Sequence, residues 1–476
     1  SFCPLCTESK TALCYPPFIP RFPAFLRPEE KILPQVLRRD ALLFYPFESM
    51  DPFLHLVREA SSDPNVLSIK ITIYRLASKA KLAEYLCAAA ENGKEVTVLM
   101  ELRARFDEQN NIQWAERMEE AGCTILYGTE GIKVHSKICL ITRRERGKIQ
   151  YITQVGTGNY NEKTAKQYTD LCLISAQPQL GADAAALFQN MATSNLEGDY
   201  KLLLASPYQL RDKVMALMDR EIAKGDKGYI FLKLNSITDR KLIDKLAQAS
   251  QAGVTVVMNV RGICCLRPGL PGLTENITVF SIVGRYLEHT RIYRFGRGED
   301  ADLYISSADF MTRNTERRVE IACPVLDQQV RRAVFHIIDV LLSDNVKTRF
   351  LGPDGLWYQR KSADEPVSSQ DVFLQQGLEG GRAAVGQVAP GNGGRDPLAG
   401  VGEVGGTGEE DGVHLPLGLE GRGHLPRLLV KFRAVVDELH VRQIPLGYIF
   451  NNVDRDRRTN HANFHRNNSP FRRLKT

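Results

Sequence analysis

The sequence predicts an α/β protein built from two related halves and followed by a C-terminal tail of different composition. Between residues 41 and 360, runs of β-branched and apolar residues alternate with amphipathic stretches of helical length. The order of these strands and helices recurs in the second part of that region. Beyond residue 361 the chain is rich in glycine, with Gly-Gly pairs at 380–381, 393–394 and 405–406.

In the first half, two amphipathic segments at 80–92 and 112–121 are predicted helices, and Gly93 suits the C-terminus of the first of them. The predicted strands share a β-branched, apolar composition and lie at 68–76, 96–102, 124–127, 136–142 and 149–155. Alternation of strands with helices predicts a mainly parallel sheet that is covered by helices.

In the second half, a helix is predicted at 242–250. The expected strands lie at 229–234, 254–260, 278–283, 292–295 and 303–306. The chain therefore divides into four predicted parts. These are an irregular N-terminal segment at 1–40, a first domain at 41–200, a second domain at 201–360 and a low-complexity tail at 361–476, which is expected to be disordered or an out-of-frame extension.

Aligning the strands of the two halves pairs residues that carry chemistry. His135-Ser-Lys137 corresponds to His289-Thr-Arg291, and the loop at 156–160 corresponds to the loop at 306–310. Arg103 and Arg105 correspond in the same way to Arg261. A duplicated fold with one histidine in each half is expected to bring the two imidazoles together at a shared cleft.

This pair of histidines fits phosphoryl transfer. A neutral imidazole is a good nucleophile, so one histidine can attack phosphorus while the other acts as acid and then base. Transfer between anions also needs cations around the phosphate, and guanidinium matches phosphate oxygens in bidentate fashion. Basic residues at or near the predicted strand ends are Arg75, Arg103, Arg105, Lys133, Lys137, Arg261, Arg285 and Arg291.

Each of these residues also has an ordinary structural interpretation. A single histidine in a strand is more often a packed or exposed residue than a nucleophile, and arginines at strand ends are usually solvated. The matching positions of His135 and His289 in a repeat favour the functional interpretation. The net charge of +6 suits an anionic ligand without indicating nucleic acid. Ten scattered cysteines and the lack of an apolar run long enough to cross a bilayer predict a cytoplasmic protein with reduced thiols.

Several motifs follow one another along the chain at Leu102–Glu108, Val134–Lys137, Gly156–Ala165, Tyr168–Asp170, Arg261–Cys264, Tyr286–Arg291 and Ser306–Asp309. Together they resemble the motifs of bacterial polyphosphate kinases of the phospholipase-D-like type. The similarity covers residues 15–360 and implies two phospholipase-D-like α/β domains packed around a shared active-site cleft.

The resemblance implies reversible transfer of the ATP γ-phosphate to polyphosphate. It implies that His135 is phosphorylated and that His289 is an acid–base partner that also lies at the nucleotide site. By the same comparison, Tyr168 and Arg261 contact ATP or ADP. The nearby Asp170 is expected to orient an imidazole.

The same comparison implies Mg²⁺ as cofactor. Arg75 and Arg105 match the arginines associated with the Mg²⁺–phosphate site. Since guanidinium cannot ligate a cation, they are expected to act through phosphate oxygens. Lys137 and Arg291 follow the two histidines and are expected to hold a phosphate group.

Two alternative functions stay open. Phospholipase-D-like hydrolases carry an Asp shortly after the His-x-Lys motif, and the residues 141–144, Ile-Thr-Arg-Arg, argue against such a phosphodiesterase. A polyanion-binding remnant is also compatible, because the N-terminal and head domains of the family do not precede residue 1. The expected partners are ATP and polyphosphate rather than nucleic acid. A homo-oligomer is expected for the full-length family, and peripheral association with a membrane stays open.

Overall fold

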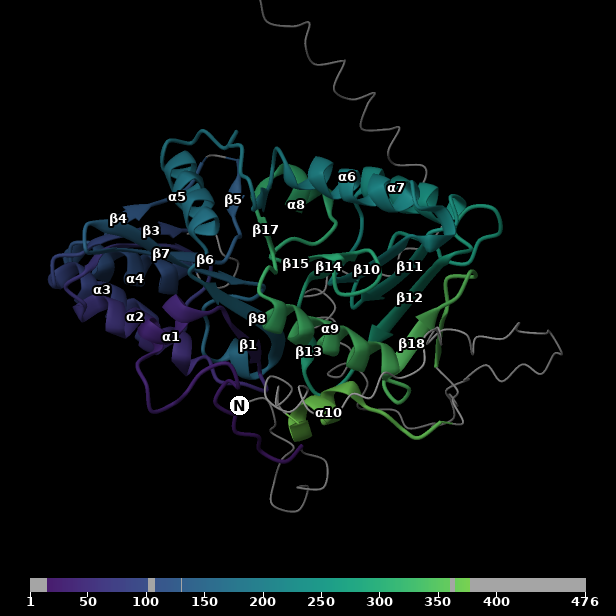
Figure 1. Ribbon diagram of the computed structural model, residues 1–476, viewed down its shortest axis with the longest axis horizontal. Helices are drawn as coiled ribbons and strands as arrows, with labels where there is room; N and C mark the ends of the chain where they lie inside the picture. Colours follow the sequence, from purple (N-terminus) through teal and green to yellow (C-terminus); the bar gives the residue numbers. More distant parts are fainter. Residues whose placement is uncertain (1–14, 102–107, 130, 360–363, 377–476) are drawn as a thin grey trace, which may run out of the picture. The chain divides into compact units, whose positions relative to one another are not determined.

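The computed structural model describes residues 15–101, 108–129, 131–359 and 364–376, which lie in one compact unit of the chain (Figure 1). Arg103 and Arg105, and the predicted tail from residue 377 onward, are outside the described residues. No helix in the described ranges is long and apolar enough to cross a bilayer.

The first half contains a mixed sheet in the order β1-β8-β7-β6-β2-β3-β4. Its strands are β1 (Ala41–Tyr45), β2 (Val66–Ile73), β3 (Glu95–Met100), β4 (Thr124–Leu126), β6 (Ile138–Glu145), β7 (Lys148–Gly156) and β8 (Tyr168–Ser175). Only β2, β3 and β4 run parallel to one another, and the other neighbours pair antiparallel.

The prediction of a mainly parallel sheet was therefore wrong. The reason is visible between β6 and β7, which are joined by Arg146 and Gly147 alone. Both residues have positive φ, 49° and 78°, as a tight two-residue hairpin requires. A connection of two residues can join only antiparallel strands, because a parallel crossover needs a dozen residues or more.

The second half repeats this arrangement. Its sheet has the order β19-β18-β12-β11-β10-β14-β15-β17-β9, with β10, β11 and β12 parallel and the other pairs antiparallel. The strands are β9 (Leu204–Ala205), β10 (Tyr229–Leu234), β11 (Thr255–Val260), β12 (Ile277–Ile282), β14 (Ile292–Phe295), β15 (Asp302–Ser306), β17 (Ile321–Pro324), β18 (Thr348–Leu351) and β19 (Trp357–Gln359). The predicted duplication within an α/β fold is confirmed.

Helices cover both sheets. Figure 1 shows α6 and α7 along one side of the second sheet and α9 on the other. Asp239 and Asp327 precede α7 and α9, and their carboxylates accept backbone N–H bonds of the first turn. The α-helices are α1 (Ile32–Arg38), α2 (Asp51–Ser62), α3 (Lys81–Glu91), α4 (Glu108–Glu120), α5 (Pro178–Ala192), α6 (Leu210–Ile222), α7 (Arg240–Gln251), α8 (Thr312–Glu316), α9 (Gln328–Ser343) and α10 (Ser369–Gln376).

Short strands from each half also pair with the other half. The strand β5 (Lys133–Val134) runs parallel to β16 (Arg318–Val319), and β13 (Leu287–Glu288) runs parallel to the start of β8. One cluster of buried apolar residues extends through the first half and into the second. The two halves are therefore joined by two short strand pairs, and each of the two histidines comes directly after one of these pairs.

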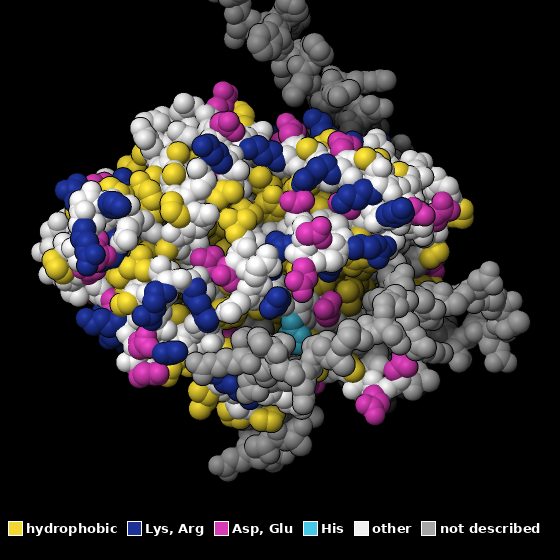
Figure 2. Space-filling view, in the orientation of Figure 1, with side chains coloured by type: hydrophobic (Ala, Val, Ile, Leu, Met, Phe, Trp, Pro, Cys, Tyr) yellow, Lys and Arg dark blue, Asp and Glu magenta, His cyan; other side chains and the backbone are white. Residues whose placement is uncertain are grey.

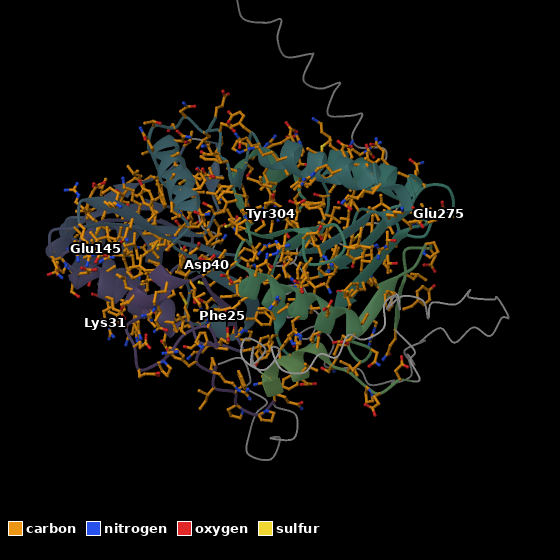
Figure 3. The ribbon with its side chains drawn as sticks, in the orientation of Figure 1. Phe25, Lys31, Asp40, Glu145, Glu275 and Tyr304 are labelled. Carbon is orange, nitrogen blue, oxygen red and sulfur yellow. The ribbon has the colours of Figure 1, made fainter. Side chains whose placement is uncertain are left out.

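Both ends of the described region are more regular than the sequence predicted. The segment expected to be irregular at 1–40 contains α1, and Phe25 (Figure 3) is buried under the guanidinium of Arg39, 5.6 Å from the ring centroid. Beyond residue 360, where the low-complexity tail was expected to begin, α10 buries Phe373 in the main apolar cluster. A helix that packs against the core in this way is part of the folded unit.

Candidate active site

The two histidines follow the two short strands that cross between the halves. The backbone N–H of His135 donates to the carbonyl of Val319 at 3.0 Å, next to the β5–β16 pair. The backbone N–H of His289 donates to Oγ1 of Thr169 at 3.1 Å, next to the β13–β8 pair. Each histidine is therefore fixed by backbone or side-chain atoms of the other half.

The imidazole of His135 is oriented by Glu320, a fully buried residue of the second half. Its Nδ1 lies 2.8 and 2.9 Å from the two carboxylate oxygens. Ser307 Oγ and Asn314 Nδ2 also donate to this carboxylate, each at 2.5 Å. An ionised carboxylate only accepts hydrogen bonds, so Nδ1 carries the proton and the lone pair of Nε2 stays free.

The imidazole of His289 is oriented in the same way by Asp170 of the first half. Its Nδ1 lies 2.8 and 3.0 Å from the carboxylate oxygens, so the predicted contact of Asp170 with an imidazole is confirmed. Thr157 Oγ1 donates to Asp170 at 2.7 Å, as Ser307 does to Glu320. Gly158 makes this approach possible, because a Cβ there would lie 2.1 Å from Asp170 Oδ2.

Burial keeps both imidazoles neutral. Desolvation lowers the pKa of His135 well below its usual value, and the positive charge of Lys137 lowers it further. Desolvation also lowers the pKa of His289 to about 4, although the charge of Asp170 opposes the shift. Burial raises the pKa of Glu320, an effect that Lys137 opposes. At neutral pH both histidines have an unprotonated ring nitrogen.

The basic residues that follow the histidines have different surroundings. Lys137 is 1% exposed; its Nζ donates to the carbonyl of His135, and burial lowers its pKa to about 7. Arg291 forms an ion pair with Asp309 at 3.0 Å and lies 3.3 and 3.2 Å from the ring nitrogens of His289. The ion pair with Asp309 already neutralises Arg291, whereas Lys137 forms no ion pair within the described residues.

A cavity of about 410 Å³ opens beside His289. The residues Tyr168 and Arg261, both predicted to contact the nucleotide, line the same cavity, and Tyr168 also meets the His289 ring at a centroid distance of 5.3 Å. Asn235 Oδ1 accepts hydrogen bonds from Nε and Nη2 of Arg261 at 2.9 and 2.7 Å, which fixes the guanidinium. The aromatic ring of Tyr168 suits a nucleotide base, and the fixed guanidinium of Arg261 suits a phosphate.

Of the two arginines predicted at the Mg²⁺–phosphate site, only Arg75 is among the described residues. The guanidinium of Arg75 lies 5.7 Å from the Tyr74 ring, which meets the His135 ring edge-on at 4.9 Å. Arg105 is outside the described residues. Across the ranges that the structure describes, no group of three or more His, Cys, Asp or Glu side chains could hold a metal ion. On the face drawn in Figure 2, basic and acidic side chains are interspersed.

The sequence prediction missed Glu320, although a signal for it was present. Tyr168-Thr-Asp170 and Arg318-Val-Glu320 occupy matching places in the two halves, after loops that were aligned with each other. Continuing that alignment pairs Asp170 with Glu320. Asp309 was included in an aligned motif, but its ion pair with Arg291 was not predicted.

Comparison with known proteins identifies the same two halves. The family model for polyphosphate kinase C-terminal domain 1 matches residues 31–197, and the model for C-terminal domain 2 matches residues 203–370. The polyphosphate kinase of Bacillus cereus is 46% identical over 362 residues, which are 75% of this chain and 52% of that protein. That of Pseudomonas aeruginosa is 43% identical over 375 residues, 78% of this chain and 54% of that protein.

A solved structure is similar as well. The crystal structure of polyphosphate kinase from Porphyromonas gingivalis matches with a TM-score of 0.71 and 36% identity, over 77% of this chain and 56% of that one. The chain spans about half the length of the curated relatives that it matches.

Proposed function

The chain belongs to the polyphosphate kinase family, and we propose that it transfers the γ-phosphoryl group of ATP reversibly to polyphosphate through a phosphorylated histidine. The main support is the orientation of His135, whose Nδ1 faces Glu320 at 2.8 Å and whose Nε2 lone pair is free. A neutral imidazole that is fixed in this tautomer is prepared to attack phosphorus.

In the first step, Nε2 of His135 forms a bond to the γ-phosphorus, and the bond from that phosphorus to the β–γ bridging oxygen breaks. ADP leaves with the electron pair. The ring becomes positively charged, and the buried carboxylate of Glu320 stabilises this charge at Nδ1. In the second step, a terminal oxygen of polyphosphate attacks the phosphohistidine, and His135 recovers its lone pair.

His289 is proposed to move a proton at the bridging oxygen. Its pKa of about 4 describes the protein without substrate. A phosphate group beside the ring adds negative charge, which raises the pKa of an imidazole toward the range that an acid catalyst requires. Since Tyr168 and His289 meet at the cavity, the nucleotide is proposed to bind there with Arg261 on its phosphates.

Mg²⁺ is proposed to arrive with the nucleotide. The described residues hold no cluster of side chains that fits a metal ion by itself, whereas ATP phosphates bind Mg²⁺ readily. Arg75 and Arg105 are then proposed to act on phosphate oxygens near the ion, because guanidinium cannot be a ligand. Lys137, whose ammonium donates to the backbone carbonyl of His135, is proposed to hold the γ-phosphate of ATP before transfer and the end of the polyphosphate chain after it.

The test is incubation of the 476-residue chain with γ-labelled ATP and Mg²⁺. We expect label in an acid-labile, base-stable form, as a phosphohistidine gives, and no label in His135→Ala. His336→Ala is the matched control, because His336 is exposed on α9 and should keep full labelling. Label that persists in His135→Ala would contradict the proposal. Salt-sensitive polyphosphate binding without labelling would instead support a polyanion-binding protein.

His289→Ala separates the two roles of that residue. If His289 protonates the departing ADP, labelling of the variant should be slow. If it acts only when polyphosphate attacks, the variant should take label at the normal rate and then fail to pass it on. Either result identifies the half-reaction in which the proton moves.

A further inference from the structure

One wall of the cavity beside His289 has little regular structure of its own. The segment from Val283 to Glu288 contains only the two-residue strand β13, and Val283 at its start is 70% exposed. Such a short segment lacks the continuous ladder of hydrogen bonds that fixes a strand inside a sheet. Its position must therefore be set by contacts from elsewhere.

Gln370 of α10 supplies three of these contacts, in addition to the pairing of β13 with β8. Its Oε1 accepts from the backbone N–H of Tyr286 at 2.8 Å, and its Nε2 donates to the carbonyl of Tyr286 at 2.9 Å. The same Nε2 donates to Oε1 of Glu288 at 2.7 Å. This side chain is 3% exposed, so it pairs with Tyr286 as a neighbouring strand would and uses both hydrogens of its amide group.

The contact continues from Glu288 to the histidine. The buried carboxylate of Glu288 accepts from Lys233 Nζ at 2.9 Å and from Thr169 Oγ1 at 3.1 Å. Thr169 Oγ1 in turn accepts from the backbone N–H of His289 at 3.1 Å. A chain of hydrogen bonds therefore joins Gln370 to the backbone of His289, through residues that are buried.

The helix that carries Gln370 is itself fixed. Asp344 accepts from the backbone N–H and the hydroxyl of Ser369, at 2.8 and 2.7 Å. Phe373, one turn later, packs edge-on against Phe44 at a centroid distance of 5.0 Å. On the cavity side, a Cβ at Gly284 would lie 2.5 Å from Gln370 Oε1, so the segment approaches Gln370 as closely as glycine allows.

We propose that Gln370 is a positioning residue that holds the segment 284–288 in place and thereby sets the nucleotide affinity of the cavity. This inference rests on the proposed function only in taking the cavity as the nucleotide site. Gln370 is not one of the residues that line the cavity. Its effect passes through Tyr286 and Glu288, which line the cavity.

The test uses Gln370→Met in the full chain, which keeps the length of the side chain and removes its three hydrogen bonds. Gln375→Ala is the matched control, because Gln375 is an exposed residue of the same helix. The first measurement is hydrogen–deuterium exchange of peptides covering 284–289 without ligand. We expect exchange to be faster by about ten-fold in Gln370→Met and unchanged in the control, since a hydrogen-bonded amide is freed.

The second measurement is calorimetric titration with the β,γ-imido analogue of ATP and Mg²⁺. We expect Kd to rise about ten-fold in Gln370→Met. Saturating ATP should restore labelling of His135 in the variant, because the reacting groups are intact. If Gln370 only stabilised the fold, Gln370→Met would lower the melting temperature, and it would not raise Kd while leaving the maximal labelling rate intact.

The outcomes separate the two ideas. Unchanged exchange at 284–289, or an unchanged Kd in a chain that binds the analogue, would overturn the positioning role. If the wild-type chain does not bind the analogue and exchange is still faster in Gln370→Met, the positioning of the segment is supported and the nucleotide site is overturned. Faster exchange together with weaker binding supports both.

Discussion

Glu320 of the second half orients His135 of the first half, with both carboxylate oxygens within 2.9 Å of Nδ1. The contact is reciprocated, because Asp170 of the first half orients His289 of the second. Each carboxylate lies just beyond the short strand pair that crosses between the halves. Neither half contains the group that orients its own histidine, so the duplicated fold prepares both imidazoles only while the halves stay together.

Replacing the carboxylate of Glu320 tests this arrangement. Glu320→Gln keeps the shape but can place an amide N–H against Nδ1 of His135, which moves the ring proton to Nε2 and blocks attack. We expect labelling by γ-labelled ATP to slow by about 100-fold or more, as wrong tautomers do in other histidine sites. The initial rate of labelling is the measurement.

A control for this variant is available on the neighbouring helix. Glu316→Gln makes the same chemical change at an exposed residue of α8, which pairs with Arg211 at 2.6 Å. Exposed ion pairs contribute little to stability, so this variant should label at the wild-type rate. Equal losses in the two variants would mean that the Glu320 effect is not specific to His135.

Gly158 should be needed for the orientation of His289. A Cβ at this position would lie 2.1 Å from Asp170 Oδ2, so Gly158→Ala must displace the carboxylate. A displacement of about 1 Å can lower a rate by about 100-fold when it moves a reacting group. We expect turnover with ATP and polyphosphate to fall accordingly. In the second half the position that matches Gly158 is an alanine, Ala308, and the carboxylate beside it belongs to the longer Glu320.

A double-mutant cycle shows whether Asp170 carries the effect. If displacement of Asp170 is the cause, Gly158→Ala should add nothing further to the loss seen in Asp170→Ala. Additive losses would show that the extra methyl group acts elsewhere, for instance on the backbone of the loop.

Residues of this site that occupy matching positions in the two halves could be predicted from the sequence. The contacts that a residue of one half makes with a residue of the other half were missed. The pairing of His135 with His289, and of their flanking loops, was visible as matching motifs. The contact of Glu320 with His135 was not visible, because it joins residues 185 positions apart through a strand pair of two residues. Hydrophobic periodicity carries no information about such a contact.

Strand direction and the last helix were missed for other physical reasons. Periodicity identifies a strand without fixing its direction, and only the short Arg146-Gly147 connection distinguishes the antiparallel pair. The helix α10 lies in a stretch expected to be low-complexity tail, and the burial of Phe373 against the core decides its structure. Tertiary packing overrides weak local signals in such segments.

Nucleotide affinity should depend on pH through Lys137. Burial lowers the pKa of this ammonium to about 7 in the protein without substrate, and only the protonated form attracts phosphate. Above pH 7 the free protein must take up a proton to bind, so Kd for the imido analogue of ATP should rise by about ten-fold per pH unit. Calorimetric titration from pH 6 to 9 measures this slope.

Lys137→Arg provides the comparison, because a guanidinium stays charged over the whole range. Ionisation of the nucleotide and of Mg²⁺-bound groups is the same in both titrations, so the difference in slope belongs to residue 137. Parallel curves for the two proteins would exclude Lys137 as the group that titrates.

Glu48 should make the folded state less stable as the pH rises toward neutrality. Its carboxylate is 2% exposed and accepts backbone N–H bonds from Phe44 and Ala24, and burial raises its pKa from an ordinary value of about 4.5 to about 7. The unfolded chain releases this proton above about pH 4.5, whereas the folded chain keeps it until about pH 7. Between these values the unfolded state binds fewer protons, so the free energy of unfolding falls with rising pH.

The full effect of this one group is on the order of 3 kcal/mol, complete at about pH 7 and absent below about pH 4.5. Urea unfolding at pH 5, 6 and 7 measures it as the difference between the wild type and Glu48→Gln, which has no proton to release. The wild type should lose stability relative to this variant at each step upward in pH. Glu29→Gln, an exposed carboxyl in the same N-terminal segment, should keep the wild-type slope. A wild-type slope in Glu48→Gln as well would place the pH dependence on another group.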